Sequence, residues 1–141
     1  MIQVDADRCI GCLSCSNVCP SKKILLEEAA GNRTISWKRC GEECDLCVEF
    51  CPAGALRLVP LDESAPEPSV TLRLASCSAC GATYAAEPML AHVESSIPSE
   101  MKRDAAGLSW VRECPACRRW IEAERASAGL ARERRIARRG L

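Results

Sequence analysis

The hydrophobic pattern of the chain predicts short strands in its first half. Short apolar runs bounded by turn residues are typical of strands. In the first 60 residues such runs occupy Met1–Val4, Ile24–Glu28, Thr34–Trp37 and Leu56–Val59. The turn residues Ala30-Gly31-Asn32 lie between the second and third runs and predict a hairpin there.

The second half combines one predicted strand with helical segments. Apolar and polar residues alternate over Val70–Leu74, which indicates a strand. Glu87–Ser95 and Glu100–Ala106 have the composition of short helices and are separated by Pro98. Residues 118–139 are rich in Ala and Arg and predict a longer C-terminal helix. The expected fold class is therefore α+β.

Twelve of the 141 residues are cysteine, and eight of these belong to an internal repeat. The repeat recurs after 32 residues and pairs Cys12 with Cys44, Cys15 with Cys47, Cys19 with Cys51 and Pro20 with Pro52. Cys9 and Cys40 are only 31 residues apart, so the second copy has one extra residue in its first loop, at positions 41–43. We expect a short helical turn after Cys15 and another after Cys47.

Cys9–Pro20 has the spacing C-x2-C-x2-C-x3-C-P, which holds 4Fe–4S clusters in bacterial ferredoxins. Three thiolates on one tight loop can bind three irons of a cubic cluster, and the cysteine before the proline then ligates the other cluster. The predicted ligands of cluster one are Cys9, Cys12, Cys15 and Cys51. Those of cluster two are Cys40, Cys44, Cys47 and Cys19. This pattern predicts a dicluster ferredoxin-like fold that carries electrons.

The remaining four cysteines form two C-x2-C pairs, Cys77 with Cys80 and Cys114 with Cys117. Two such pairs make a closed, tetrahedral four-thiolate site. Zinc is the default metal and would be structural, as in a zinc ribbon. A single iron, as in rubredoxin, uses the same geometry, and a third cluster is a further alternative.

These sites divide the chain into predicted parts. Residues 1–59 form the two-cluster domain. Residues 60–69 contain three prolines, which exclude a helix and a central strand, and form a linker. Residues 70–120 form a zinc-ribbon or rubredoxin-like module, and residues 121–141 a basic C-terminal helix. A small unit of this kind buries little apolar surface and relies on metals for stability.

Cysteine chemistry and charge narrow the function classes. Met1–Asp7 has neither the basic start nor the apolar stretch of an export signal, so we expect a cytoplasmic protein with metal-bound cysteines rather than disulfides. Residues 118–141 carry eight Arg against three Glu, a net charge of +5, which leaves −5 on residues 1–117. A basic tail on an acidic body favours docking to a protein partner over binding nucleic acid.

Catalysis by this chain alone is not expected. The sequence has no Gly-rich nucleotide loop, nucleophile with a base, or paired-carboxylate motif. All twelve cysteines are assigned as ligands, so no metal position remains open to a substrate. Trp37, Trp110 and Trp120 each lie close to a metal cysteine in the sequence, and we interpret them as shielding the sites from water.

The two cysteine runs, Trp37 before the second run, and the two later C-x2-C pairs resemble the small iron–sulfur subunit of formate hydrogenlyase and related membrane-bound hydrogenases. The resemblance covers about residues 7–120. It implies an electron-transfer subunit in a hetero-oligomeric redox complex, with catalytic and other iron–sulfur subunits as partners. Such a complex is of the hydrogenase, formate dehydrogenase or aldehyde oxidoreductase type. The subunit would span no membrane itself but could belong to the cytoplasmic arm of a membrane-associated complex.

Two other functions fit parts of the sequence. A free, diffusible ferredoxin would need the two clusters but not the tail. A zinc-ribbon protein that binds nucleic acid or acts as a scaffold, with purely structural clusters, would use the Arg-rich tail. The acidic body and the scarcity of aromatic residues argue against that second alternative.

Overall fold

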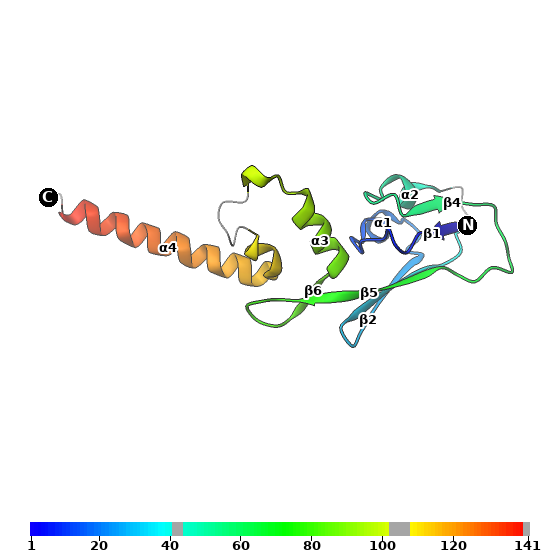
Figure 1. The fold of residues 1–141 in the computed structure, drawn as a ribbon, viewed down its shortest axis with the longest axis horizontal. Coiled ribbons are helices and arrows are strands. Elements are labelled where there is room, and N and C mark those ends of the chain that lie inside the picture. The colour runs from blue at the N-terminus through cyan, green and yellow to red at the C-terminus, as the bar shows by residue number, and fades with distance from the viewer. Residues whose placement is uncertain (41–43, 102–107, 140–141) are drawn as a thin grey trace.

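The computed structural model describes residues 1–40, 44–101 and 108–139. It contains both helices and sheets, so the expected α+β class is confirmed (Figure 1). The elements in chain order are β1 (Ile2–Val4), α1 (Ser14–Val18), β2 (Ile24–Ala29), β3 (Asn32–Trp37), α2 (Leu46–Glu49), β4 (Leu56–Leu58), β5 (Ser69–Ser76), β6 (Thr83–Ala86), α3 (Glu87–Ser96), two 3-10 turns, η1 (Ser99–Met101) and η2 (Ser109–Arg112), and α4 (Pro115–Arg139).

The strands and hairpin predicted in the first half are all present. β1 and β4 pair in antiparallel fashion, with Ile2 opposite Leu58, and β2 and β3 form the hairpin. The loop of this hairpin is Ala30-Gly31, and both residues have positive φ angles, 49° and 76°. A two-residue loop with positive φ at both positions is of the type that matches the right-handed twist of the flanking strands. The helical turns expected near Cys15 and Cys47 are α1 and α2.

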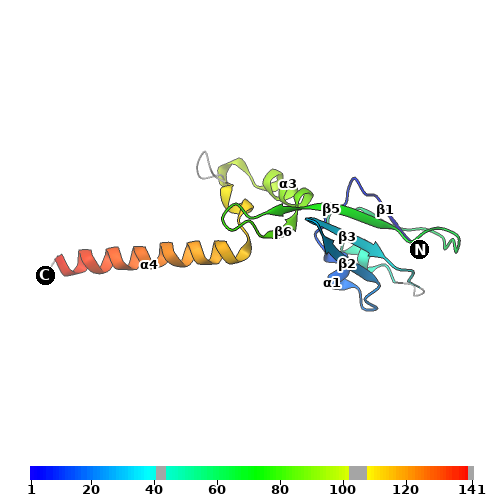
Figure 2. The same ribbon diagram turned by 90° about the horizontal axis from the view of Figure 1, so that it is seen from below.

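Strand β5 belongs to the predicted second half of the chain but pairs with a strand of the first half. It pairs with β3 on one side, with Ile35 opposite Val70, and with β6 on the other. The sheet therefore runs β2-β3-β5-β6 and includes strands from both halves of the chain (Figure 2). Sequence alternation identified the strand but not its neighbours, because a period of two shows which face is buried and says nothing of which edges are paired.

The segment before β5 is held against the end of β3. The Trp37 backbone N–H donates to Pro68 O at 3.0 Å, and Lys38 Nζ forms an ion pair with Glu67 at 2.7 Å. Arg39 Nη2 donates to the carbonyl of Ala65 at 2.9 Å. These contacts bring β5 alongside β3 instead of leaving it at the end of a free linker.

The main hydrophobic core is shared by the two halves. Ile35 and Trp37 of β3 are its most deeply buried large residues. From the second half, Val70, Leu72 and Ala86 pack into the same cluster. Burial of a large apolar side chain contributes about 1.5–3 kcal/mol, so both halves contribute to the stability of this core.

Gly11 lies at a tight contact between the two halves. Its φ is +70°, and a Cβ atom on it would lie 2.6 Å from Leu72 Cδ1 and 2.8 Å from Ala86 Cβ. The loop that follows Cys9 therefore packs directly on β5 and on the end of β6. Only a residue without a side chain fits this approach.

A second, smaller core lies at the other end of β5. Ala75, Ala85, Leu90 and Val111 are buried together, which joins α3 and η2 to the sheet. The helix predicted at Glu87–Ser95 is confirmed as α3, with proline in its first turn, where proline is well tolerated. Most of the helix predicted at Glu100–Ala106 lies outside the described residues.

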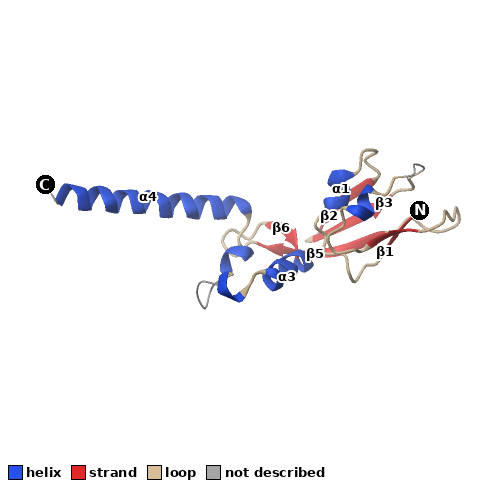
Figure 3. Ribbon diagram, turned by 90° about the horizontal axis from the view of Figure 1, so that it is seen from above, coloured by secondary structure: helices blue, strands red, loops and turns tan. Residues whose placement is uncertain are grey.

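The predicted C-terminal helix is α4, which begins three residues earlier than expected, at Pro115. It has 25 residues, or a length of about 37 Å, and projects away from the sheet in Figures 1 and 3. The side chains from Glu122 to Gly129 are all exposed. Among the helices of the described part, none has the length and apolar character needed to cross a bilayer.

Candidate metal centres

The first cysteine run lines a cavity together with one cysteine of the second run. The four thiols are those of Cys9, Cys12, Cys15 and Cys51. Apolar residues form the rest of the wall, among them Ile35 and Trp37 of β3 and Leu56 of β4. The structure thus brings together the four residues predicted to bind cluster one, although they come from two runs that are far apart in sequence.

A second cavity has the complementary set of thiols, those of Cys19, Cys40, Cys44 and Cys47. Cys19 comes from the first run and the other three from the second. The extra residue predicted in loop 41–43 lies outside the described residues. The second cavity therefore places Cys19 of the first run beside three cysteines of the second run.

The two exchanged cysteines have equivalent surroundings. The Lys23 backbone N–H donates to Cys19 Sγ at 3.3 Å, and the Ala55 N–H donates to Cys51 Sγ at 3.3 Å. In both cases the donor is four residues after the cysteine. The two copies of the 32-residue repeat therefore form the same hydrogen bond to sulfur. Backbone donors to sulfur stabilise a thiolate and help to set the potential of a bound cluster.

The backbone of the first loop is shaped to surround a charged group. Gly11 and Leu13, on either side of Cys12, have φ angles of 70° and 66°. For Leu13, which is not glycine, this left-handed conformation costs about 1–2 kcal/mol. Loops that alternate in this way turn successive N–H groups inward and form the concavities found at Fe–S sites.

Three of the cavity thiols ionise less readily than a free thiol. Burial raises the pKa of the Cys15 thiol to about 11, and it also raises the pKa of Cys9 and Cys47. Neighbouring thiolates add to the effect. Bound iron would supply the positive charge that keeps such buried thiols deprotonated. All twelve cysteines are free of disulfide bonds, so each thiol is available as a ligand.

Cys77, Cys80, Cys114 and Cys117 form a third group, whose sulfur atoms all lie within 4.8 Å of one another. Cys80 Sγ and Cys114 Sγ are 3.8 Å apart. A tetrahedral metal with bonds to sulfur of about 2.3 Å requires a separation of about 3.8 Å along each edge. These four thiols therefore fit a single tetrahedral ion.

Backbone N–H groups prepare this site for a metal. Cys114 N–H donates to Cys77 Sγ at 3.1 Å, and Cys117 N–H donates to Cys114 Sγ at 3.5 Å. The first of these bonds is the main reason that the pKa of Cys77 falls to about 6. A lowered pKa favours the thiolate, the form that binds metal.

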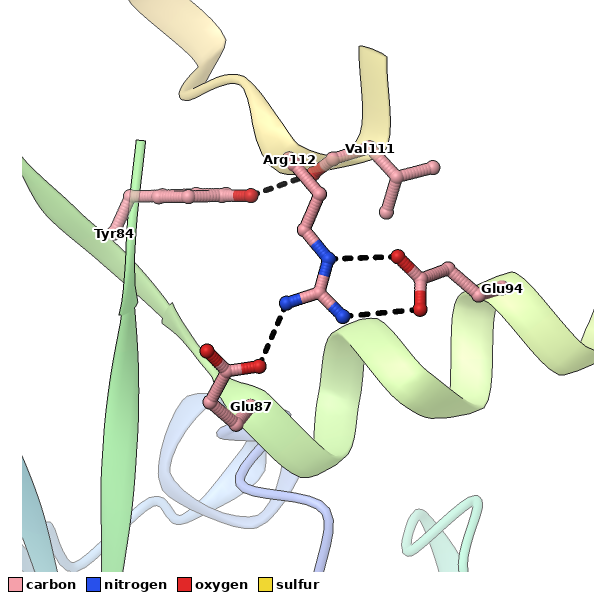
Figure 4. A network of polar contacts seen from close by, with 5 residues as sticks. All are labelled: Tyr84, Glu87, Glu94, Val111 and Arg112. Atoms are coloured by element: carbon pink, nitrogen blue, oxygen red, sulfur yellow. Dashed lines mark hydrogen bonds and ion pairs between the residues drawn. The ribbon is translucent and has the colours of Figure 1, made fainter. Parts of the chain in front are cut away.

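A polar network braces the second cysteine pair against the sheet. Arg112, two residues before Cys114, donates through Nε and Nη2 to Glu94 of α3 at 2.7 and 3.0 Å, and through Nη1 to Glu87 at 2.7 Å. Tyr84 of β6 donates its hydroxyl to the carbonyl of Val111 (Figure 4). The hydrogen bonds from Arg112 lower the pKa of Glu94. Sequence reasoning missed this network, since nothing in the spacing of these residues signals it.

The three tryptophans differ in their surroundings. Trp37 is only 2% exposed and lines both cysteine cavities, which agrees with a shielding role. Trp120 is 62% exposed and Trp110 44%, with the Arg118 guanidinium 5.5 Å from the Trp110 ring centre. Shielding is therefore not supported for these two residues.

Comparison with known proteins gives a family match for the N-terminal part. Residues 1–52, which include both cysteine runs, match the model of the 4Fe-4S dicluster domain family.

Three relatives that match part of the chain are named as iron–sulfur or electron-transfer proteins. It is 35% identical over 86 residues to a probable iron-sulfur subunit of the Frd operon of Proteus vulgaris, covering 50% of this chain and 54% of that protein. It is 35% identical over 69 residues to the thiosulfate reductase electron transfer subunit PhsB of Salmonella typhi, covering 45% and 36%. It is 33% identical over 78 residues to an iron-sulfur protein of Rhodospirillum rubrum, covering 43% and 40%.

The chain thus spans about half or less of the length of these relatives. Two of the names describe iron–sulfur or electron-transfer subunits. They agree with the expectation that this chain serves an oxidoreductase without being its catalytic component.

Proposed function

We propose that the chain is an electron-transfer subunit that relays electrons through two 4Fe–4S clusters within an oxidoreductase complex. The observation that carries this proposal is the pair of adjacent cavities, each with four thiols drawn from both cysteine runs. Cys9, Cys12, Cys15 and Cys51 hold cluster one, and Cys19, Cys40, Cys44 and Cys47 hold cluster two. When bound, such a group supplies a site that accepts and returns one electron.

The chain's own residues supply the environment for this transfer. The two cavity linings have Trp37 in common, so clusters held there are neighbours. Ile35 and Leu56 keep water from cluster one, and Ile2 and Ile24 do the same for cluster two. Exclusion of water and hydrogen bonds to sulfur are the means by which a protein sets cluster potentials.

The four-thiolate site holds a single metal ion in a structural role. Zinc is our first assignment, and a rubredoxin-type iron is the alternative. Support comes from the tetrahedral spacing of the four sulfurs and from the absence of a fifth ligand among the described residues around them. The ion would fix the start of α4 to the end of β5, since Cys114 and Cys117 flank Pro115 and Cys77 follows Ser76.

Metal analysis of protein purified without oxygen tests the assignment. We expect about eight irons, about eight acid-labile sulfides and one further ion, which elemental analysis identifies as zinc or iron. A preparation that is fully loaded with only about four irons would contradict the two-cluster assignment.

We infer that α4 attaches the chain to its partner subunit, which is of the hydrogenase, formate dehydrogenase or aldehyde oxidoreductase type. Support comes from its exposed side chains between Glu122 and Gly129 and from the net charge of +5 over residues 118–141. A free, diffusible ferredoxin would not need a projecting basic helix such as α4. The −5 charge on residues 1–117 disfavours nucleic acid as the ligand.

Deletion of residues 121–141 tests this attachment. The shortened chain should keep both clusters, reducible by dithionite, and lose its partner at moderate salt, because exposed charge contacts weaken as salt rises. Co-purification of the shortened chain with its partner at the full level would refute docking through α4.

A further inference from the structure

Trp37 has an unusual position between the two cysteine cavities. It is the last residue of β3, and it is the residue that the two cavity linings share. Its side chain is almost fully buried, with 2% exposed. Among the described residues, its Nε1 is the one buried side-chain nitrogen or oxygen without a hydrogen-bond partner.

A buried N–H group without an acceptor is costly. The loss of its hydrogen bonds to water amounts to about 1–3 kcal/mol, and about 90% or more of buried polar groups have a partner for this reason. An indole nitrogen carries one hydrogen and can only donate. The orphaned group therefore indicates that an acceptor occupies one of the cavities that Trp37 lines.

The side chains of the cavity walls offer only sulfur as an acceptor. The wall of the first cavity consists of thiols and apolar residues. The second adds Lys23 and Lys38, whose ammonium groups also only donate. A cluster bound by the thiols brings sulfides and thiolates, which carry negative charge and accept hydrogen bonds.

We propose that Trp37 Nε1–H donates a hydrogen bond to a sulfur of one of the two clusters and raises the reduction potential of that cluster. The inference rests on the proposed two-cluster function. A cluster becomes more negative when it takes up an electron, so a donor stabilises its reduced form more than its oxidised form. Trp37 thus contributes to a difference in potential between the two sites, together with the two lysines that line only the second cavity.

Replacement of Trp37 by phenylalanine keeps an aromatic ring and removes the donor. In the Trp37→Phe protein we expect both clusters to remain, with the potential of one shifted to a more negative value and that of the other unchanged. Redox titration followed by electron paramagnetic resonance measures both. Trp110→Phe is the matched control, since Trp110 is 44% exposed and lines neither cavity, and both potentials should stay in place.

A second measurement does not depend on a variant. In wild-type protein carrying tryptophan labelled with 15N in the indole ring, the reduced clusters should show a 15N hyperfine coupling from one nitrogen. Its absence, or unchanged potentials in a fully loaded Trp37→Phe protein, overturns the inference. If wild-type protein binds fewer than two clusters, the proposed function fails as well, so the two failures are distinguishable by iron content.

Discussion

At the scale of single residues, two glycines with positive φ angles, Gly11 and Gly31, show two different constraints on the backbone. Gly11 combines a positive φ with direct contact to Leu72 and Ala86, so it joins the first cysteine loop to the strands behind it. Gly31 also has a positive φ, +76°, but no atom lies within 4 Å of where its Cβ would be. A side chain at either position would have the cost of a positive φ, but only at Gly11 would it also clash with neighbouring atoms.

Gly11→Ala should destabilise cluster one. A Cβ at 2.6 Å from Leu72 Cδ1 forces the loop or β5 to move, in addition to the cost of about 1–2 kcal/mol for a non-glycine residue in the left-handed region. We expect a total loss of about 2–5 kcal/mol, since overpacking adds about 1–3 kcal/mol. Loss of cluster absorbance in denaturant measures it.

Gly31→Ala serves as the control for this measurement, because it has the conformational cost without the clash. If Gly11→Ala and Gly31→Ala prove equally stable and lose iron equally fast, close packing of the first loop on β5 is wrong.

Cys19→Ala should damage cluster two, although Cys19 lies in the first run, because its thiol lines the second cavity. The paramagnetic spectrum of the variant should resemble that of Cys44→Ala. Cys51→Ala should resemble Cys12→Ala instead, since both of those thiols line the first cavity. Spectra that group by run, with Cys19→Ala matching Cys12→Ala, would show that the fourth cysteine is not exchanged.

At the scale of elements, sequence and structure agree most closely where local pattern is sufficient. The hairpin loop Ala30-Gly31, the turns at α1 and α2 and the four early strands follow from turn residues and cysteine spacing. The grouping of the eight cysteines around two cavities was also predictable, because the fourth cysteine of such a run points away from the other three.

The pairing of β5 with β3 was not predictable, because it depends on contacts between residues such as Ile35 and Val70 that lie far apart in the chain. Three prolines before β5 suggested separation, yet the same segment is held in place by Lys38 and Arg39. The short strand β6 was missed as well, since Thr83–Ala86 has only four residues, too few for a clear alternating pattern.

Arg112→Met should weaken the four-thiolate site. The change keeps a long side chain but removes its hydrogen bonds to Glu87 and Glu94, which hold the turn before Cys114 on α3. These groups are partly exposed, so we expect a loss of about 1 kcal/mol and faster transfer of the metal to a colorimetric chelator. The two iron–sulfur clusters should keep their full iron content.

The contribution of this network depends on pH in one direction. Since the pKa of Glu94 is lowered, the stabilisation is complete above the usual pKa of a glutamate and disappears as the pH falls through the lowered value. Arg125→Met is the control, because Arg125 forms an exposed pair with Glu122 within α4. Equal rates of metal release from the two variants would contradict a bracing role for Arg112.

At the scale of the whole molecule, the shared sheet makes the halves depend on each other. A fragment of residues 1–59 keeps all eight predicted cluster ligands but lacks Val70, Leu72 and Ala86 of the main core. Each of the two larger residues contributes about 1.5–3 kcal/mol, so the fragment should lose its clusters at lower denaturant and at a higher rate in air than the full chain.

A fragment of residues 1–120 is the control for this prediction, since it retains the whole sheet and the four-thiolate cysteines. If the 1–59 fragment holds both clusters as firmly as the 1–120 fragment, the predicted boundary at residues 60–69 separates two independent folding units despite the pairing of β3 with β5.

The direction of α4 determines which surface of the chain stays uncovered when the helix is bound. The helix leaves the sheet on the side away from β1 and the short helices α1 and α2 that carry the cysteine runs (Figure 1). A protein held along α4 therefore leaves the surface around the two cavities uncovered. Under the proposed docking through α4, the chain would stay bound to one protein while the surface around its cavities remains open for electron exchange with another.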